Sequence, residues 1–537
     1  AVTTGVQNTL IGGLAGDALT TNGLNVAVGY GALSTEDTGS RNVAIGVSAL
    51  STQNADTTNY NVAVGYNSGA AVTTGIFNTL IGGLAGDALT DSDRNVAVGY
   101  GALSADTLGS RSVAIGQAAL TSQNFTTATN TYNVAVGHGA GENVTTGVQN
   151  TLVGALAGDA LTDADHNVAI GASTLTTDTL GTGSVAIGYA ALNEQNFTTA
   201  TTTYNVAIGF KAGESVTTGT LNTLVGGLTG DALTTGEENV AMGYQALGTA
   251  TKSDANVAIG NSALEALNHT TQTNSFNTAV GYAAGAAVTT GVQNTFVGGL
   301  AGENATTPDS SVFIGFNAGG DGVVTGNQNV LIGQDAGKNI TSANTSVMIG
   351  HNNGDAMVNG GANTSVGSGN AFSSTGVDTE FIYGRNATGG GASTMTIGNG
   401  DTDATLAIDG SDTSWAAASD LRLKKNIVTS TAGLSFIKEL RPIQYEWKNK
   451  GEVDSSITRY HEADSTEPCR GVGGTFHGFV AQEVKTAIDN HASQFSDKHN
   501  IWRERVDGIQ SVSPGNLVPM LVKAIQELEA RIATLEG

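Results

Sequence analysis

A five-residue motif recurs along most of the chain at nearly constant spacing. Asn-Thr-Leu-Ile-Gly at residues 8–12 returns as Asn-Val-Ala-Val-Gly at 25–29, and 21 copies reach residue 363, most of them 17 residues apart. Self-similarity at a short fixed period is the signature of a solenoid. A 17-residue unit rich in Gly, Thr, Asn and Val is too short for a helix pair and poor in helix formers. The repeat therefore predicts stacked β-coils, and the chain as a whole is expected to be mainly β.

Each unit contains the parts of one coil. Alternation places the two branched residues of the motif on one face of a short strand, and the closing glycine permits a bend. A second apolar stretch, such as Ala32-Leu33, predicts a second short strand. Stacked copies would bury a continuous core. We also expect the motif asparagines to form a column whose amides pair along the axis.

The units group into a longer period. Every fourth step lengthens to 19 or 21 residues, so Val-Thr-Thr-Gly recurs at 2, 72, 144, 216 and 288. We predict four superrepeats of about 72 residues over 1–286 and a degenerate fifth over 287–370. The longer step should push a loop outward at regular heights. Residues 371–418 lose the motif and are expected to form a β neck or a distal tip with a different strand layout.

Charge and composition exclude several classes of function. The chain carries a net charge of -25, of which -24 falls in residues 1–419. Nucleic-acid binding needs clustered Lys and Arg, so we expect none. No apolar run approaches ~18 residues, so we expect no membrane insertion. One cysteine excludes a disulfide framework within the chain. The eight histidines show no metal-ligand spacing, and we expect neither a metal nor a cofactor.

The repeat motif is similar to the head repeats of trimeric autotransporter adhesins of the YadA type, which share an Asn-Ser-Val-Ala-Ile-Gly core. Ser-Val-Ala-Ile-Gly at 112–116 matches closely. The resemblance covers about residues 1–370 and implies a trimeric, left-handed, parallel β-roll. The usual unit of that family is shorter than 17 residues, which leaves the coil shape and its handedness open.

Residues 419–537 have an ordinary globular composition and predict a small α+β domain. Residues 433–440 have helical spacing, 441–447 favour a strand, and 479–484 favour a strand leading into a helix. The last stretch predicts a helix with Asn516 as its N-cap. Its apolar residues step by three and four as in a coiled-coil seam, which by itself favours a dimer. The predicted seam consists of Val518, Leu521, Ile525, Leu528, Ile532 and Leu535.

This segment resembles the intramolecular chaperone auto-processing domain of phage tail spikes and fibres, the endosialidase type. The matching motifs occur in family order: Ser-Asp-x-Arg-x-Lys-x-Asn-Ile from 419, Leu-Arg-Pro from 440, Gly-Phe-Val-Ala-Gln-Glu-Val from 478, and the closing helix. The resemblance implies that the domain forms a trimer, guides folding of the preceding β-fibre and then cuts itself off. It implies a catalytic dyad of Ser419 and Lys424, and a homotrimer in place of the dimer that the seam favours.

The chemistry of such a cut restricts which bond breaks. A serine hydroxyl needs a base, and lysine serves as one when burial lowers its pKa. Attack by Ser419 on its own carbonyl would require a strained four-membered ring, whereas attack on the Ala418 carbonyl passes through a five-membered ring. We therefore predict cleavage between Ala418 and Ser419, with the bond between Ser419 and Asp420 as the alternative.

Together these features predict an extracellular virion tail fibre, a homotrimer that attaches to a host cell-surface receptor, either a glycan or an outer-membrane protein. We expect a region preceding Ala1 to join it to other virion tail proteins. The only enzyme activity expected is single-turnover autoproteolysis. A bacterial trimeric surface adhesin is one alternative. A polysaccharide-degrading tail spike is another, but it needs paired carboxylates in a groove, and the repeat places its acids in turns.

Overall fold

A computed structural model describes residues 2–21, 23–409, 416–417, 421, 424–457, 460–470, 474–495, 500–505 and 508–537. The chain divides into two compact units, Ala1–Ala418 and Ser419–Gly537. We refer to the first as the shaft and to the second as the C-terminal domain.

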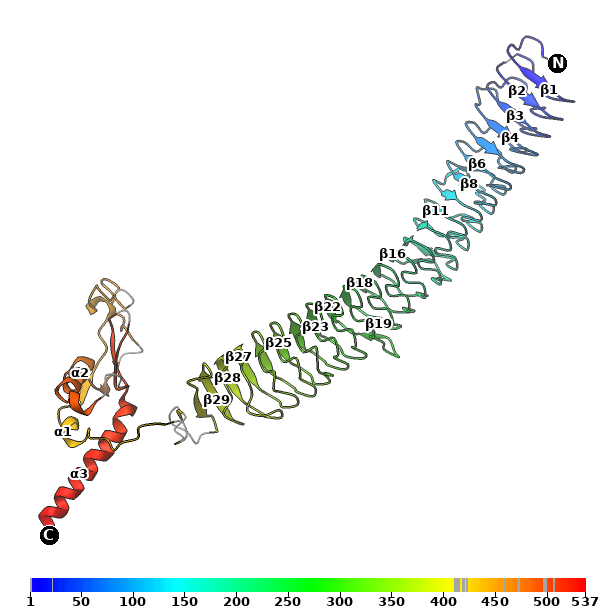
Figure 1. The fold of residues 1–537 in the computed structure, drawn as a ribbon. Helices are drawn as coiled ribbons and strands as arrows, with labels where there is room; N and C mark the ends of the chain where they lie inside the picture. The colour runs from blue at the N-terminus through cyan, green and yellow to red at the C-terminus, as the bar shows by residue number, and fades with distance from the viewer. Residues whose placement is uncertain are drawn as a thin grey trace. The chain divides into compact units, whose positions relative to one another are not determined.

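The shaft is a β-solenoid of about 23 turns with coils of about 17 residues, as the repeat predicts. Each coil contributes one short strand that pairs in parallel, in register, with the strand of the next coil (Figure 1). The parallel strands are β1 (Thr9–Ile11), β2 (Val26–Val28), β3 (Val43–Ile45), β4 (Val62–Val64), β5 (Thr79–Ile81), β6 (Val96–Val98), β8 (Val113–Ile115), β10 (Val134–Val136), β11 (Thr151–Val153), β12 (Val168–Ile170), β14 (Val185–Ile187), β16 (Val206–Ile208), β17 (Thr223–Val225), β18 (Val240–Met242), β20 (Val257–Ile259), β22 (Thr278–Val280), β23 (Thr295–Val297), β24 (Val312–Ile314), β25 (Val330–Ile332), β26 (Val347–Ile349), β27 (Thr364–Ser368), β28 (Phe381–Arg385) and β29 (Thr394–Gly398).

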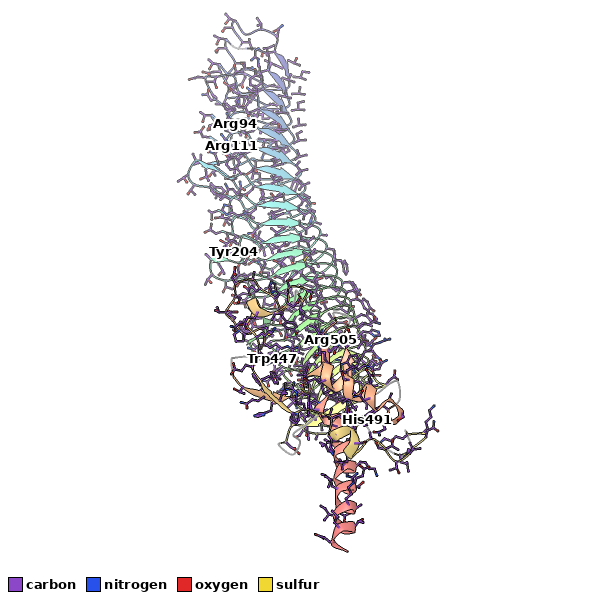
Figure 2. All side chains as sticks on the ribbon, turned by 90° about the vertical axis from the view of Figure 1, so that its left-hand side faces the viewer. Arg94, Arg111, Tyr204, Trp447, His491 and Arg505 are labelled. Carbon is purple, nitrogen blue, oxygen red and sulfur yellow. The ribbon has the colours of Figure 1, made fainter. Side chains whose placement is uncertain are left out.

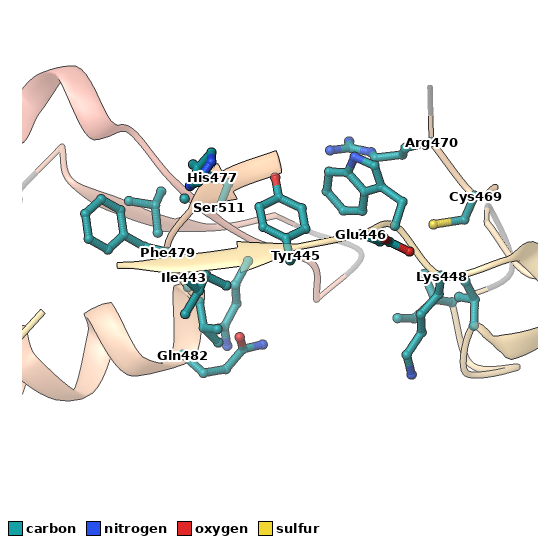
Figure 3. A pocket seen from close by; sticks show the side chains of 18 of the residues that line it. Ile443, Tyr445, Glu446, Lys448, Cys469, Arg470, His477, Phe479, Gln482 and Ser511 are labelled. Carbon is teal, nitrogen blue, oxygen red and sulfur yellow. The ribbon is translucent and has the colours of Figure 1, made fainter. Parts of the chain in front are cut away.

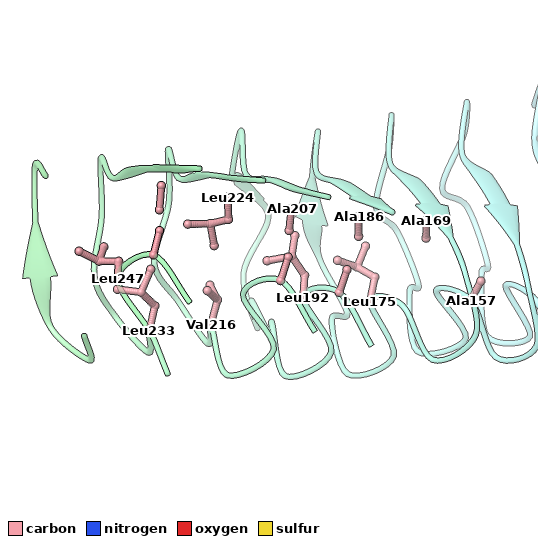
Figure 4. Packing of buried hydrophobic residues seen from close by; sticks show 14 of the residues in the cluster. Ala157, Ala169, Leu175, Ala186, Leu192, Ala207, Val216, Leu224, Leu233 and Leu247 are labelled. Carbon is pink, nitrogen blue, oxygen red and sulfur yellow. The ribbon is translucent and has the colours of Figure 1, made fainter. Parts of the chain in front are cut away.

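The core of the shaft runs along the inside of the coils. One wall is the middle residue of each strand, such as Ala207 or Leu224, and the opposite wall holds leucines such as Leu192 and Leu247, all fully buried (Figure 4). These leucines belong to the second apolar stretch of the repeat. The prediction of a second strand there is wrong, because Leu192 has a left-handed φ of 48°, which a strand does not allow. The stretch is a turn whose leucine points inward.

The branched residues that flank each middle position share one face of the strand, and that face is the outer one. Ile81 and Ile115 remain 39% and 38% exposed, while Ala97 between their coils is fully buried. Because the strands bury small alanines and display isoleucines outward, a long apolar stripe lies on the outside of the single chain. Large exposed apolar patches are typical of interfaces.

The motif glycine follows the strand with a φ that L side chains avoid. Gly82 has φ +136°, and a Cβ added there would lie 2.4 Å from the carbonyl oxygen of Gly99 in the next coil. The equivalent glycines of neighbouring coils are equally close to one another. The glycine column therefore sets how tightly one coil can stack on the next.

The asparagine column is buried and hydrogen-bonded mainly to the backbone. The Asn42 amide N–H donates to Asn25 Oδ1 over 2.9 Å, and Asn25 Nδ2 donates to the Gly39 carbonyl over 3.0 Å. Direct amide-to-amide contacts occur at some steps, such as Asn239 Nδ2 to Asn222 Oδ1 at 3.1 Å. The expected amide pairing is thus secondary, because the side chains satisfy backbone groups that the turns leave unpaired.

The longer steps add small parallel sheets beside the main one. They pair β7 (Gly109–Ser110) with β9 (Thr129–Asn130), β13 (Gly181–Thr182) with β15 (Thr201–Thr202), and β19 (Ser253–Asp254) with β21 (Thr273–Asn274).

A buried carboxylate lies at the base of two of these loops. Asp106 Oδ1 accepts the amide N–H groups of Gly109 and Phe125, and Asp106 Oδ2 accepts Gln123 Nε2 over 2.6 Å. Burial raises the pKa of the Asp106 carboxyl, and these hydrogen bonds oppose that shift. Asp178 repeats the arrangement one superrepeat later. The loop bases are therefore held by internal hydrogen bonds.

The parallel stack continues beyond residue 370. The expected change of layout does not occur at Phe381–Arg385, because β28 pairs in parallel with β27, and β29 with β28. Glu380 replaces the motif asparagine, is fully buried, and its N–H still donates to Asn363 Oδ1 over 2.8 Å. Only then does the direction reverse, with β30 (Ala404–Ala407) and β31 (Ala416–Ala417) antiparallel.

The C-terminal domain is a small α+β unit, as predicted. Its strands form two antiparallel pairs, and its described helices are α1, α2 and α3 with three short 3-10 turns. In order these are α1 (Leu434–Ile437), β32 (Ile443–Tyr445), η2 (Lys450–Glu452), β33 (Phe476–Gly478), α2 (Ala481–Asn490), η3 (Ala492–Gln494), β34 (Trp502–Glu504), β35 (Gln510–Val512), η4 (Pro514–Leu517) and α3 (Val518–Glu536).

The predicted cap of the last helix is wrong. Helix α3 starts after Leu517 without a side-chain cap, and Asn516 lies in the preceding 3-10 turn η4. Its Nδ2 donates to the Asn500 carbonyl over 2.8 Å, so the side chain ties the turn to a neighbouring segment.

We predict that Gly82→Ala destabilises the shaft by about 2–4 kcal/mol, because it adds backbone strain and a clash with the next coil. Gly83→Ala is the matched control, since its Cβ would meet Tyr100 Cδ2 at an ordinary 3.5 Å. Denaturant unfolding of the full chain measures both. Equal midpoints for the two variants would contradict the role given to the glycine column.

Candidate functional site

The predicted processing site lies at the boundary of the two compact units. Ala418, Ser419 and Asp420 fall outside the described residues, so their arrangement stays a prediction. Lys424 is described and exposed, and its backbone N–H donates to the Leu421 carbonyl over 3.1 Å. In the single chain, therefore, Lys424 is not desolvated by burial.

The core of the C-terminal domain is formed by aromatic and aliphatic residues around Phe436. Phe436 is fully buried, and its ring meets that of Phe495 edge-on at a centroid distance of 4.8 Å. Val484 and Ile488 on α2 and Leu517 before α3 complete the cluster. Helices α1, α2 and α3 thus share one small core.

A carboxylate on α3 holds the start of α1. The Leu434 N–H donates to Glu527 Oε2 over 2.8 Å, and Lys523 lies 3.6 Å from the other oxygen of the same carboxylate. The first N–H groups of a helix lack intrahelical partners, and Glu527 accepts a hydrogen bond from one of them in α1. The contact fixes the closing helix against the segment that follows the predicted cleavage site.

A fork of hydrogen bonds joins two of the sequence motifs. Arg441 of Leu-Arg-Pro donates from Nε to Glu483 Oε2 over 3.0 Å, and Arg441 Nη2 also contacts Glu483 Oε1. Two parallel charge-assisted hydrogen bonds fix the mutual orientation of both groups. The Arg441 guanidinium holds the pKa of the Glu483 carboxyl below its ordinary value. The motifs that carried the family resemblance therefore meet in space.

An open cavity of about 720 Å³ lies beside the sheet of β32 and β33. Tyr445 lies in its middle, His477 and Ser511 toward one end, and Arg470 and Cys469 toward the other (Figure 3). The described lining offers aromatic surface from Tyr445 and Trp447.

The six predicted seam residues all lie on α3 and are exposed in the single chain. Their exposed fractions run from 43% at Leu521 and Leu528 to 86% at Leu535, while the buried residue of the helix is Ala524. The helix thus packs through another face. Its apolar seam is left available for other chains.

Sequence reasoning missed a column of exposed side chains on the shaft, formed by the residue before each motif position. Arg94, Arg111 and Tyr204 belong to it and follow one side of the shaft (Figure 2). Most of these residues have left-handed φ, such as 57° at Arg94 and 66° at Arg111. The sequence contains this column, because one residue precedes every copy of the motif. It was not recognised because the residue type at that position varies from coil to coil.

Two further features bear on function. Among the described helices none is long and apolar enough to cross a membrane. The described residues also contain no group of three or more His, Cys, Asp or Glu able to hold a metal ion.

We predict that Phe436→Ala destabilises the C-terminal domain by about 3–5 kcal/mol, because it empties the centre of a small core. The helical circular dichroism signal reports this domain, since every described α-helix lies in it. Phe476→Ala, at a residue 36% exposed, is the control and should cost clearly less. Indistinguishable melting of the two variants would contradict the assigned core.

The comparisons with known proteins agree with this division of the chain. No curated protein and no solved structure matches it. Residues 419–493 match a family model described as the chaperone of endosialidase. This match at the C-terminus of a β-solenoid shaft fits a tail fibre that carries a C-terminal intramolecular chaperone.

Proposed function

We propose that this chain is a homotrimeric phage tail fibre that attaches the virion to a host cell-surface receptor. Its C-terminal domain guides assembly of three shafts and then releases itself by cleavage at Ser419. The observation that carries the proposal is the endosialidase-type chaperone match that begins at residue 419, where the shaft ends.

The exposed seam of α3 supports assembly through the C-terminal domain. Apolar residues at alternating steps of three and four, left in water in a single chain, favour a coiled coil. A helix that displays Ile525 at 65% exposure gains stability when that surface is covered. Three helices joined at this point would align the three shafts from one end.

The outer face of the shaft supports the same assembly. From β1 to β26 the outward strand positions hold Val or Thr first and Val or Ile third, with Met242 as the exception. Aromatic residues such as Tyr66 and Tyr100 follow the motif glycine and are about 60% exposed. A monomer with this stripe would be prone to aggregate. Pairing the stripes of three parallel shafts covers them and makes the coils of one chain stabilise those of the next.

Assembly also supplies a reason for timed cleavage. Lysine accepts a proton from serine only when its own pKa is lowered, and burial is the usual cause. Lys424 is exposed in the single chain. If the trimer covers Lys424 next to Ser419, the base becomes active only after the chains have assembled. Lys424 would then take the proton of the Ser419 hydroxyl as its Oγ attacks the Ala418 carbonyl carbon. The peptide C–N bond breaks and the Ser419 nitrogen leaves as a protonated amine. Water opens the resulting ester, which leaves a carboxylate on Ala418 and the free hydroxyl on Ser419.

We predict that Ser419→Ala and Lys424→Met each yield an uncleaved, assembled fibre, while the wild-type chain separates into shaft and C-terminal domain. Lys425→Met is the matched control and should still be cleaved. Denaturing gels with intact-mass measurement of the new ends identify the bond. Persistence of the full-length wild-type chain after folding would contradict self-processing without affecting the trimer proposal.

A further inference from the structure

The column of residues that precede the motif asparagine has a distinct composition in the first third of the shaft. Over six consecutive coils it carries only arginine and aromatic side chains, which we call the Arg–aromatic ladder: Arg41, Tyr60, Phe77, Arg94, Arg111 and Tyr132. Elsewhere the column is mixed and includes Gln, Leu, Ala, Ser and Thr. Neither the shaft core nor the chaperone uses these six side chains.

The upper part of the ladder is a continuous stack. The Arg41 guanidinium lies over the Tyr60 ring at 5.2 Å, and the Tyr60 and Phe77 rings are stacked at 5.5 Å with 11° between their planes. The Arg94 guanidinium lies over the other end, 5.4 Å from the Phe77 ring. Two rings are thus enclosed by two cations. Such contacts hold each side chain in one orientation.

The lower part repeats the pairing. Arg111 lies over the Tyr132 ring at 5.6 Å, and Arg111 Nη1 donates to Tyr132 Oη over 2.8 Å. The backbone adds to this order, because ladder residues have left-handed φ values from 51° to 66°. Non-glycine residues pay roughly 1–2 kcal/mol for that conformation. The shaft therefore keeps a strained backbone that sends one ordered side chain outward per coil.

The ladder is cationic on an acidic shaft. Residues 1–419 contain seven Lys and Arg, and three of them are ladder arginines. The described ion pair of the ladder joins Arg94 to Asp93 at 3.6 Å, and the Arg94 side chain remains 51% exposed. Arg41 and Arg111 each use Nη1 as a donor to the hydroxyl of the ring that they cover. The remaining N–H donors of a guanidinium group match carboxylates in a fork.

Spacing defines the shape of the ligand. Successive coils are about 4.8 Å apart, so the ladder offers donors along a straight line about 24 Å long. The three guanidinium groups occupy the first, fourth and fifth positions of this row, so they are about 14 Å and about 5 Å apart along the axis. Several cations in one row fit a linear polymer that carries more than one negative charge. The Tyr60 and Tyr132 hydroxyls accept from arginine and can still donate to neutral polar groups such as sugar hydroxyls.

We propose that the Arg–aromatic ladder binds an acidic polysaccharide that carries carboxylates, laid along the shaft axis. This inference rests on the proposed function, since it names the receptor class of the fibre. Three shafts present three ladders, so weak contacts on each chain add up by avidity.

The test measures binding of full-length fibre to immobilised polygalacturonate, with neutral dextran as the comparison. The triple variant Arg41→Gln, Arg94→Gln, Arg111→Gln suits the column, because Gln149 and Gln293 already occupy it with φ 60°. We expect binding about tenfold weaker or more in the variant, and weaker wild-type binding as salt rises. Lys211→Gln, Lys252→Gln, Lys338→Gln removes equal charge elsewhere and should bind as wild type.

Several outcomes would overturn the inference. Equal loss in both triple variants, or equal binding to polyglutamate, would mean that net charge alone is responsible. A ladder variant with a lower trimer fraction or melting temperature would show that the ladder is a contact between subunits. Adsorption of the fibre to host cells distinguishes failure of this inference from failure of the proposed function. If cells bind the ladder variant and the wild type equally, the ladder is not the receptor-binding site. If cells bind neither, the fibre does not attach to that host.

Discussion

In-register stacking of one coil on the next is the constraint on which the rest of the shaft depends. A single coil contains a three-residue strand and turns, and its backbone groups find partners mainly in the coils above and below, as Gly82 N–H does at the Val64 carbonyl. The stack brings glycine backbones so close that no Cβ fits between them. A coil is therefore stable only within a column, and stability grows by nearest-neighbour contacts.

The same geometry explains why such a shaft benefits from a chaperone. Each coil places one to three non-glycine residues in the left-handed region, for example Leu103 and Arg111. That strain appears as each coil forms and is offset only after the next coil has stacked. The first coils are therefore the least stable ones. In the proposed trimer, three chains of near-identical coils could also align in wrong registers, and a domain that joins the chains at one end would resolve both difficulties.

Much of the fold could be predicted from the sequence, because the repeat gives the number of residues per coil and shows which side chains alternate between the two faces of a strand. The parallel coils were predictable, and so were the three helices and strand β32 of the C-terminal domain, whereas β34 and β35 were not predicted. The turn at Leu192 was not, since an apolar pair resembles a short strand until its φ is known. The stack beyond residue 370 was missed because Glu380 replaces asparagine while keeping its backbone contact. The partners of Arg441 required the fold itself, because Glu483 lies 42 residues away.

The number of chains in the folded fibre tests the account most directly. Apolar columns outside the coils and an exposed seam on α3 are unfavourable in a free chain, and we propose that three parallel copies cover both. Light scattering of the folded, uncleaved protein should give three times the chain mass of 53.9 kDa. A soluble, folded species of one chain mass, with its isoleucines and tyrosines in water, would contradict the account.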